Sequence, residues 1–108
     1  FLARLLSGLF KPNNPILGCD YSGTVEEVGK NVKEFNIGDE VYGQLDKRTG
    51  THTEYISVST NEVSCIPENL SHVEAASVGV AGSIALQCLR DHGGINPGHK
   101  VLINGASV

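Results

Sequence analysis

Polar and apolar residues alternate in short segments along the first two thirds of the chain, a pattern typical of β-strands. The alternation is clearest at residues 51–58, where every second side chain would face the same side of an extended chain. Residues 24–28, 40–43 and 62–66 are shorter segments of the same kind. Glycine, proline and asparagine residues separate these segments and favour tight turns. The pattern predicts a unit built mainly from short strands.

A helical pattern follows. Residues 71–74 read Ser-His-Val-Glu, a capping box in which the serine hydroxyl and the glutamate carboxylate bond the free N–H groups of a first turn. Residues 73–89 are small and apolar on nearly every side, which predicts a buried helix. Gly79 and Gly82 each weaken a helix by about 1 kcal/mol relative to alanine, so we expect two helical pieces. A cation and two glycines in residues 90–94 predict the helix end.

The two ends of the chain carry further patterns. Residues 1–10 place leucines at helical spacing, which predicts an amphipathic segment that covers a core. Residues 100–104 are a short apolar run entered from a helix, which predicts a buried strand. Strands, then a helix, then a buried strand that runs into a turn of small residues suggest a β-rich domain joined to the first unit of an α/β domain. We expect the chain to be part of a longer protein.

Composition narrows the class of protein. The net charge of −4 leaves no basic surface for nucleic acid. The sequence contains no uninterrupted run of about 18 apolar residues, so we expect no membrane span. The three cysteines are odd in number and form no Cys-x-x-Cys pair. They argue against a disulfide framework and a structural zinc site, and they predict a reducing, cytoplasmic setting.

The order of the motifs resembles the quinone oxidoreductase branch of the medium-chain dehydrogenase/reductase family. Four stretches carry this resemblance in the family's order and spacing: residues 18–25 with 28–29 and 32, residues 38–43, residues 54–55 with 66–71 and 74–76, and residues 97–107. The resemblance implies a mainly β fold, in which residues 1–80 are part of an irregular, incomplete GroES-like barrel. Residues 81–98 would be a connecting helix and turn. Residues 99–108 would be the first strand of a truncated Rossmann domain.

The same resemblance implies a function for the longer protein. A hydride would pass from NADPH or NADH to a small-molecule quinone, enone or related carbonyl compound, held in the cleft between the two domains. The enzyme would need no zinc and would form a homodimer through its Rossmann domain. We expect residues 1–108 alone to show no turnover. The alternative is a non-catalytic GroES-like β-barrel that serves as a binding module.

Five residues are candidates for cofactor contact through the resemblance. Gly105, Ala106 and Ser107 would begin the turn that presents backbone N–H groups to a pyrophosphate. Ile84 stands where the family usually has a threonine that touches the cofactor, and Ser83 beside it is the candidate substitute. Ile84 has no hydrogen-bonding group, so the expected contact depends on Ser83.

Metal and acid–base candidates are few. The zinc enzymes of the family take a histidine ligand from a Gly-His-Glu stretch, and the aligned residues here are Gly18, Cys19 and Asp20. No further ligands stand at suitable spacing, and none of the four histidines pairs with another, so we expect no metal. Asp20 and Tyr21 are the catalytic candidates. A structural role is the competing interpretation for both: a turn cap for Asp20 and barrel packing for Tyr21.

Overall fold

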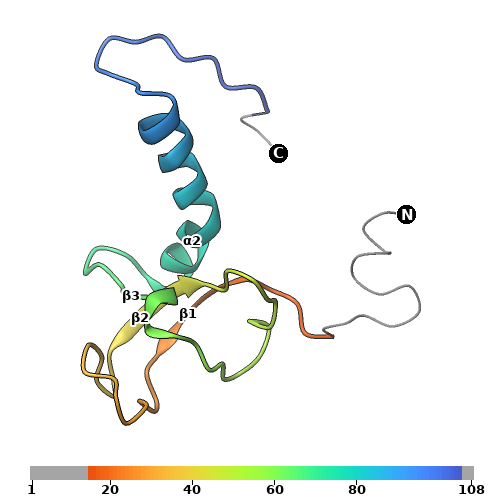
Figure 1. Ribbon diagram of the computed structural model, residues 1–108, viewed down its shortest axis with the longest axis vertical. Helices are drawn as coiled ribbons and strands as arrows, with labels where there is room; N and C mark the ends of the chain where they lie inside the picture. Colours follow the sequence, from red (N-terminus) through yellow and green to blue (C-terminus); the bar gives the residue numbers. More distant parts are fainter. Residues whose placement is uncertain (1–14, 106–108) are drawn as a thin grey trace.

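A computed structural model describes residues 15–105 of the chain. Strands come first and the long helix follows, which confirms the order that the sequence predicts (Figure 1). In chain order the elements are β1 (Asp20–Thr24), β2 (Glu40–Gln44), the 3-10 turn η1 (Thr60–Glu62), β3 (Val63–Cys65), α2 (His72–Leu86) and the π-helical η2 (Gln87–His92).

The three strands form one antiparallel sheet with the order β1-β2-β3. Asp20 at the start of β1 lies opposite Gln44 at the end of β2, and Val41 of β2 lies opposite Cys65 of β3. Directly after β1, the Val25 N–H donates a hydrogen bond to the Asp39 carbonyl, and the Gly38 N–H donates one to the Val25 carbonyl, at 2.9 Å each. This arrangement brings the start of β1, the end of β2 and the start of β3 to the same end of the sheet.

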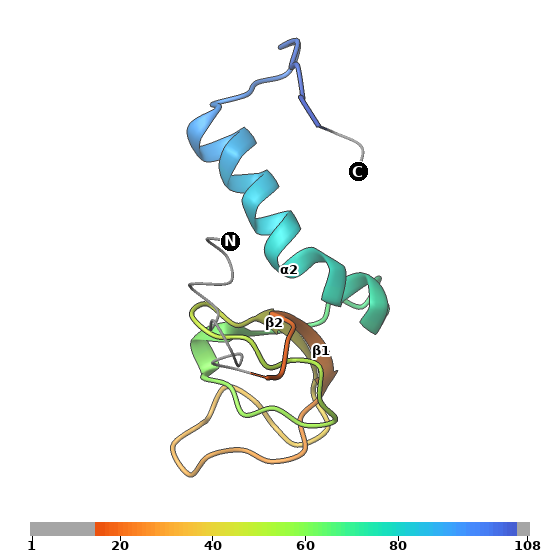
Figure 2. The ribbon, with the colours of Figure 1, turned by 90° about the vertical axis from the view of Figure 1, so that its right-hand side faces the viewer.

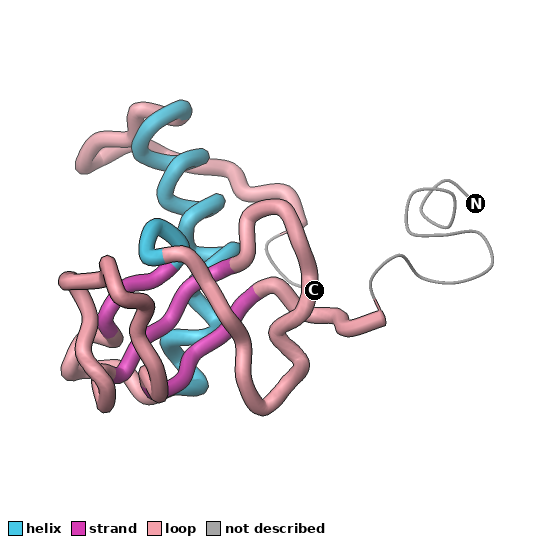
Figure 3. The backbone as a smooth tube through the Cα atoms, turned by 60° about the horizontal axis from the view of Figure 1, so that its bottom comes forward, coloured by secondary structure: helices cyan, strands magenta, loops and turns pink. Residues whose placement is uncertain are grey.

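Helix α2 packs its first turns against the sheet and then runs away from it (Figures 2 and 3). The buried apolar residues in the described part of the chain are Val41 of β2, Leu45 just after β2, and Ala75 of α2. The Cα radius of gyration is 17.1 Å, whereas a compact domain of this length has about 13 Å. The described residues therefore enclose a small core, and most of α2 lacks a covering layer.

The strands differ from the predicted segments mainly at residues 20–28 and 51–58. Residues 40–43 fall within β2, which extends to Gln44, and residues 62–66 contain β3 as expected. The strand predicted at residues 24–28 is wrong except at Thr24, because β1 runs from Asp20 to Thr24. Residues 51–58 form no strand, because no strand in the described part of the chain lies beside them to supply hydrogen bonds. Alternation alone does not make a strand when both edges of a segment lack a partner.

The helix is also simpler than predicted. The capping box is confirmed: the Ser71 N–H and hydroxyl donate to the Glu74 carboxylate at 2.9 and 2.7 Å. Residues 72–92 are one continuous helix instead of two pieces, since tertiary contact at Gly79 outweighs the weak helix propensity of glycine. The helix end is confirmed at Gly93 and Gly94, and Gly94 has a φ of +54°.

Burial of the helix is less than its composition predicts. Only Ala75 and Gly79 of α2 are buried, while Val73, Ile84 and Leu86 are exposed. By length and composition alone, the 21-residue helix from His72 to His92 could cross a membrane, contrary to the expectation from the sequence, and 11 % of its most apolar stretch is buried. Core helices of soluble proteins meet the same criterion, so the finding is weak support for a membrane span. It does identify α2 as a large apolar surface without a cover in the described chain.

The predicted strand at residues 100–104 is not formed. Leu102 is 95 % exposed, and no strand lies beside it to complete a ladder. The amphipathic segment predicted at residues 1–10 lies outside the described residues.

Candidate functional site

Asp20 joins the sheet to the middle of the helix. Its Oδ1 atom accepts a hydrogen bond of 2.7 Å from the backbone N–H of Val80, sixty residues further along the chain. Gly79, immediately before Val80, is buried against Asp20 and the carbonyl oxygen of Gly43. A side chain at position 79 would collide with the carboxylate, so the glycine allows the close approach. Asp20 thus makes a structural contact, but not as the turn cap that the sequence predicts, because its partner lies in the interior of α2.

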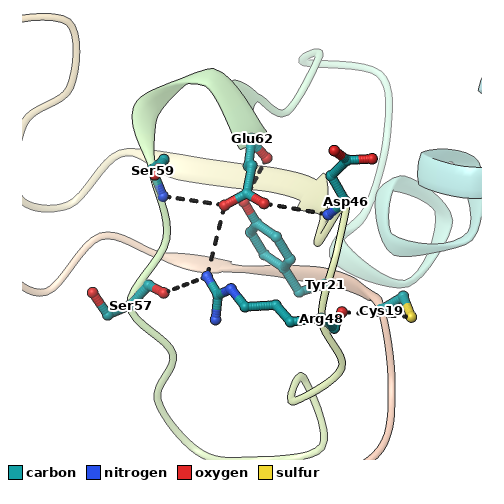
Figure 4. A network of polar contacts seen from close by, with 7 residues as sticks. All are labelled: Cys19, Tyr21, Asp46, Arg48, Ser57, Ser59 and Glu62. Carbon is teal, nitrogen blue, oxygen red and sulfur yellow. Dashed lines mark hydrogen bonds and ion pairs between the residues drawn. The ribbon is translucent and has the colours of Figure 1, made fainter.

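Tyr21 is part of a polar network that joins β1 to η1 and to the residues after β2 (Figure 4). Its hydroxyl donates a hydrogen bond of 2.7 Å to the backbone carbonyl of Glu62. Burial, with a smaller contribution from the negative charge of Glu62, raises the pKa of Tyr21 to about 12. A phenol that is already donating and is this weakly acidic is a poor proton donor near neutral pH. The geometry favours a packing role for Tyr21.

The Glu62 carboxylate organises the loop between β2 and β3. It accepts hydrogen bonds from the backbone N–H groups of Asp46 and Ser59, at 3.2 and 3.3 Å, and forms an ion pair of 3.6 Å with Arg48. Arg48 in turn donates to the carbonyl of Ser57 at 2.8 Å. The two backbone N–H donors hold the pKa of Glu62 below its ordinary value, and Arg48 adds to this effect. The sequence reasoning missed this cluster, although the spacing Ser59-Thr-Asn-Glu62 is a capping-box signal.

A polar depression of about 410 Å³ lies between β2, η1, β3 and α2. Neutral hydrogen-bonding side chains, those of Gln44, Asn61, Ser64 and Ser83, form much of its wall. Gly79 forms part of the floor on the helix side. Asp46 and Glu62 stand at the same wall, and no lysine or arginine side chain lines it. The lining suits an uncharged polar group and disfavours a phosphate.

The predicted cofactor contacts are only partly brought together. Ser83 lines the depression one turn after Gly79, whereas Ile84 is outside it and 55 % exposed. Gly105 has a φ of +75°, the left-handed conformation expected of glycine in a tight turn, but it does not line the depression. Ala106 and Ser107 lie outside the described residues. The structure thus separates a polar depression at Ser83 from the start of the expected phosphate-binding turn.

The residues considered as metal ligands contact other groups of the fold. Within residues 15–105, no three His, Cys, Asp or Glu side chains lie close enough to share a metal ion. The Cys19 sulfur is 4.0 Å from the carbonyl oxygen of Arg48, and all three cysteines are free thiols. His72 lies 3.4 Å from the Glu40 carboxylate. These contacts give Cys19 and His72 partners within the fold.

Comparison with known proteins finds a family that the sequence of this chain matches. Residues 3–85 match the family described as alcohol dehydrogenase GroES-like domain. The mitochondrial NAD(P)H oxidoreductase RTN4IP1 of Homo sapiens is 43 % identical over 96 residues, which cover 84 % of this chain and 24 % of that protein. The protein of the same name from Danio rerio is 39 % identical over 97 residues, which cover 85 % of this chain and 25 % of the relative.

A second group of relatives consists of much larger proteins. The probable polyketide synthase 24 of Dictyostelium discoideum is 36 % identical over 100 residues, which cover 92 % of this chain and 4 % of that protein. The chain therefore spans about a quarter of the oxidoreductase relatives that it matches and a small part of the synthases. The same sequence unit occurs in proteins of very different overall size.

Proposed function

We propose that this chain, which belongs to the alcohol dehydrogenase GroES-like domain family, forms part of the catalytic domain of an NAD(P)H-dependent oxidoreductase. The sheet and the single long helix agree with the fold of that domain. The observation that carries the proposal is the polar depression beside Ser83, which has a mostly neutral lining and lies where the family resemblance implies a cofactor contact. The substrate we propose is a quinone, an enone or a related carbonyl compound.

The chemistry of the depression fits one end of the cofactor. A nicotinamide ring carries a carboxamide, which needs both a donor and an acceptor, and the Ser83 hydroxyl and the side-chain amides of Gln44 and Asn61 offer both. The acidic groups at the wall would repel the pyrophosphate. We therefore assign the nicotinamide end to the depression, and the phosphates to the turn that begins at Gly105 with Ala106 and Ser107.

The residues of this chain contribute more to the positioning of the two reactants than to proton transfer. When bound, the nicotinamide supplies the hydride. Asp20 accepts a backbone hydrogen bond and Tyr21 donates one, so both candidate acids are occupied in structural contacts. The Ser83 hydroxyl, on an exposed turn of α2, is free to orient the carboxamide. Holding two reactants in a productive geometry contributes several kcal/mol to such a reaction, about 7–11 in well-oriented systems.

The exposed apolar side of α2 supports a second domain in the proposal. We propose that residues 81–98 connect residues 1–80 to a Rossmann domain whose first strand is residues 99–108. That domain would cover Ile84 and Leu86 and complete the cleft, and it would form a homodimer interface. The free thiols fit a reducing compartment. We propose that the whole protein is located in the cytoplasm. The alternative is the mitochondrion, which is part of the relatives' names.

The test uses the whole protein that contains this chain, dialysed against a chelator. We expect NADPH or NADH to be consumed when a quinone or an enone is added, without loss of rate after chelation. A rate that disappears on chelation and returns with zinc would contradict the zinc-independent mechanism.

The alternative, a non-catalytic binding module, has one observation in its favour. The position expected to touch the cofactor holds Ile84, which is exposed and has no hydrogen-bonding group. Failure of the whole protein to bind either nucleotide at millimolar concentration would favour this alternative.

A further inference from the structure

We infer that Asp20 is a positioning residue for the nucleotide: its carboxylate fixes the turn of α2 that presents Ser83 to the polar depression. The inference rests on the proposed function, because it assumes that Ser83 contacts the cofactor. The inference goes beyond the proposed function because it assigns a role to the Asp20 carboxylate, which does not line the depression.

The first observation is the place of the hydrogen bond. Val80 lies in the interior of α2, where backbone N–H groups ordinarily bond the carbonyl four residues earlier. Here the Val80 N–H donates to Asp20 Oδ1 at 2.7 Å. A hydrogen bond to a charged acceptor is stronger than a neutral one, and this bond is partly buried. The contact therefore ties one particular helical turn to the first residue of β1.

The second observation is the close approach at Gly79. The space that a Cβ atom would take at this position is filled by the Asp20 carboxylate, and the Gly43 carbonyl oxygen would be 3.2 Å away. Gly43 belongs to β2 and lines the depression, as does Gly79 itself. The close approach requires glycine at position 79, because the Asp20 carboxylate and the Gly43 carbonyl leave no room for a Cβ atom.

The third observation links this turn to Ser83. Positions 79 and 83 are four residues apart, so they lie on the same face of the helix. Both line the depression. A shift or rotation of α2 at Val80 would move Ser83 together with Gly79, whereas Ile84 points away from the depression in the observed position. The Asp20 contact thereby determines which side chain of the pair, Ser83 or Ile84, meets the ligand.

The chain supplies a matched control. Ser22, two residues after Asp20 on β1, donates a hydrogen bond of 2.7 Å from its hydroxyl to the carbonyl of His72 in the first turn of α2. Loss of this bond also weakens the contact between β1 and α2, but at a turn that carries no residue of the depression. Ser22→Ala therefore reports the cost of a merely structural contact.

The experiment measures NADPH binding by the whole protein, by fluorescence titration, for a double-mutant cycle of Asp20→Ala and Ser83→Ala. We expect each single variant to raise the Kd by about fivefold or more, and the double variant to be little weaker than either, since both act through the same hydroxyl. Asp20→Asn, which keeps an oxygen acceptor, should bind NADPH nearly as well as the wild type. Ser22→Ala should keep the wild-type Kd.

The outcomes separate the two proposals. No NADPH binding by the wild-type protein would overturn the proposed function. Wild-type binding with additive effects of Asp20→Ala and Ser83→Ala, or an Asp20→Ala Kd equal to that of Ser22→Ala, would overturn the positioning role alone. Because Asp20→Ala also removes a fold contact, each variant is compared only after circular dichroism shows the wild-type helix signal. If Asp20→Ala fails this check, Asp20→Glu replaces it, and an unchanged Kd would overturn the role, since its longer side chain displaces the acceptor.

Discussion

Replacing Gly79 by alanine tests the close packing of α2 on the sheet. The added methyl group would point at the Asp20 carboxylate and lie 3.2 Å from the Gly43 carbonyl oxygen. The carbonyl belongs to a paired strand and cannot move freely. Either Asp20 leaves its hydrogen bond with Val80 or the helix moves outward from the sheet.

Two opposing effects set the size of the change. Alanine stabilises a helix by about 1 kcal/mol relative to glycine. Overpacking costs about 1–3 kcal/mol, and a lost hydrogen bond to a charged group costs about 1.5–3 kcal/mol. We expect the losses to prevail, with a net decrease in the free energy of unfolding of up to about 2 kcal/mol if one of them occurs and more if both do. For a domain of this size, each kcal/mol lowers Tm by about 4–8 °C.

The assay is urea unfolding followed by the helical circular dichroism signal. Gly82→Ala is the control, because it brings the same gain in helix propensity. Its methyl group would meet the side chain of Val78 on the same helix, which is 40 % exposed and must shift slightly to make room. We expect Gly82→Ala to raise the free energy of unfolding by up to about 1 kcal/mol, less the cost of moving the stiff Val78 side chain. Equal stability of Gly79→Ala and Gly82→Ala would refute the close-packing account.

Three further predictions concern the polar contacts. Tyr21→Phe should lower the free energy of unfolding by about 1 kcal/mol in urea titrations, because the bond to the Glu62 carbonyl is lost; it should also remove a tyrosine ionisation near pH 12 from an absorbance titration. Glu62→Gln should destabilise the protein at neutral pH but not in acid: the folded pKa of Glu62 is lowered, so its contribution is present above about pH 4.3 and is lost as the pH falls through the folded value. A difference between Glu62→Gln and wild type that is the same at neutral and acid pH would contradict this. Ser71→Ala should cost about 1 kcal/mol in the same unfolding assay, and no loss would show that the capping box contributes nothing.

Local signals in the sequence predicted the parts of the fold that depend on neighbouring residues. The capping box at Ser71 and Glu74 and the glycine end at Gly94 need only a few adjacent residues, and both are present. The strands at β2 and β3 are bounded by turns that the sequence also contains. These elements follow from backbone chemistry within a few residues.

Contacts between distant residues decided the rest. Gly79 looked like a helix breaker, because nothing near it in the sequence shows that Asp20 packs there. Residues 51–58 alternate as a strand does, but a strand also needs a partner, and none lies beside them. The role of Glu62 depends on Arg48 and Asp46, fourteen and sixteen residues away. For the candidate site, family resemblance singled out Ser83, and only the structure set it beside Gly79 and apart from Ile84.

The central claim is that this chain is part of an enzyme that transfers a hydride from a nicotinamide. The most direct measurement supplies the whole protein with NADPH or NADH that carries deuterium in both positions at C4 of the nicotinamide ring, together with an enone acceptor, and determines the mass of the product. We predict one deuterium in the reduced carbon skeleton and a slower reaction with the deuterated cofactor. A reduced product without deuterium, or no reduced product under conditions in which the nucleotide binds, would contradict the claim.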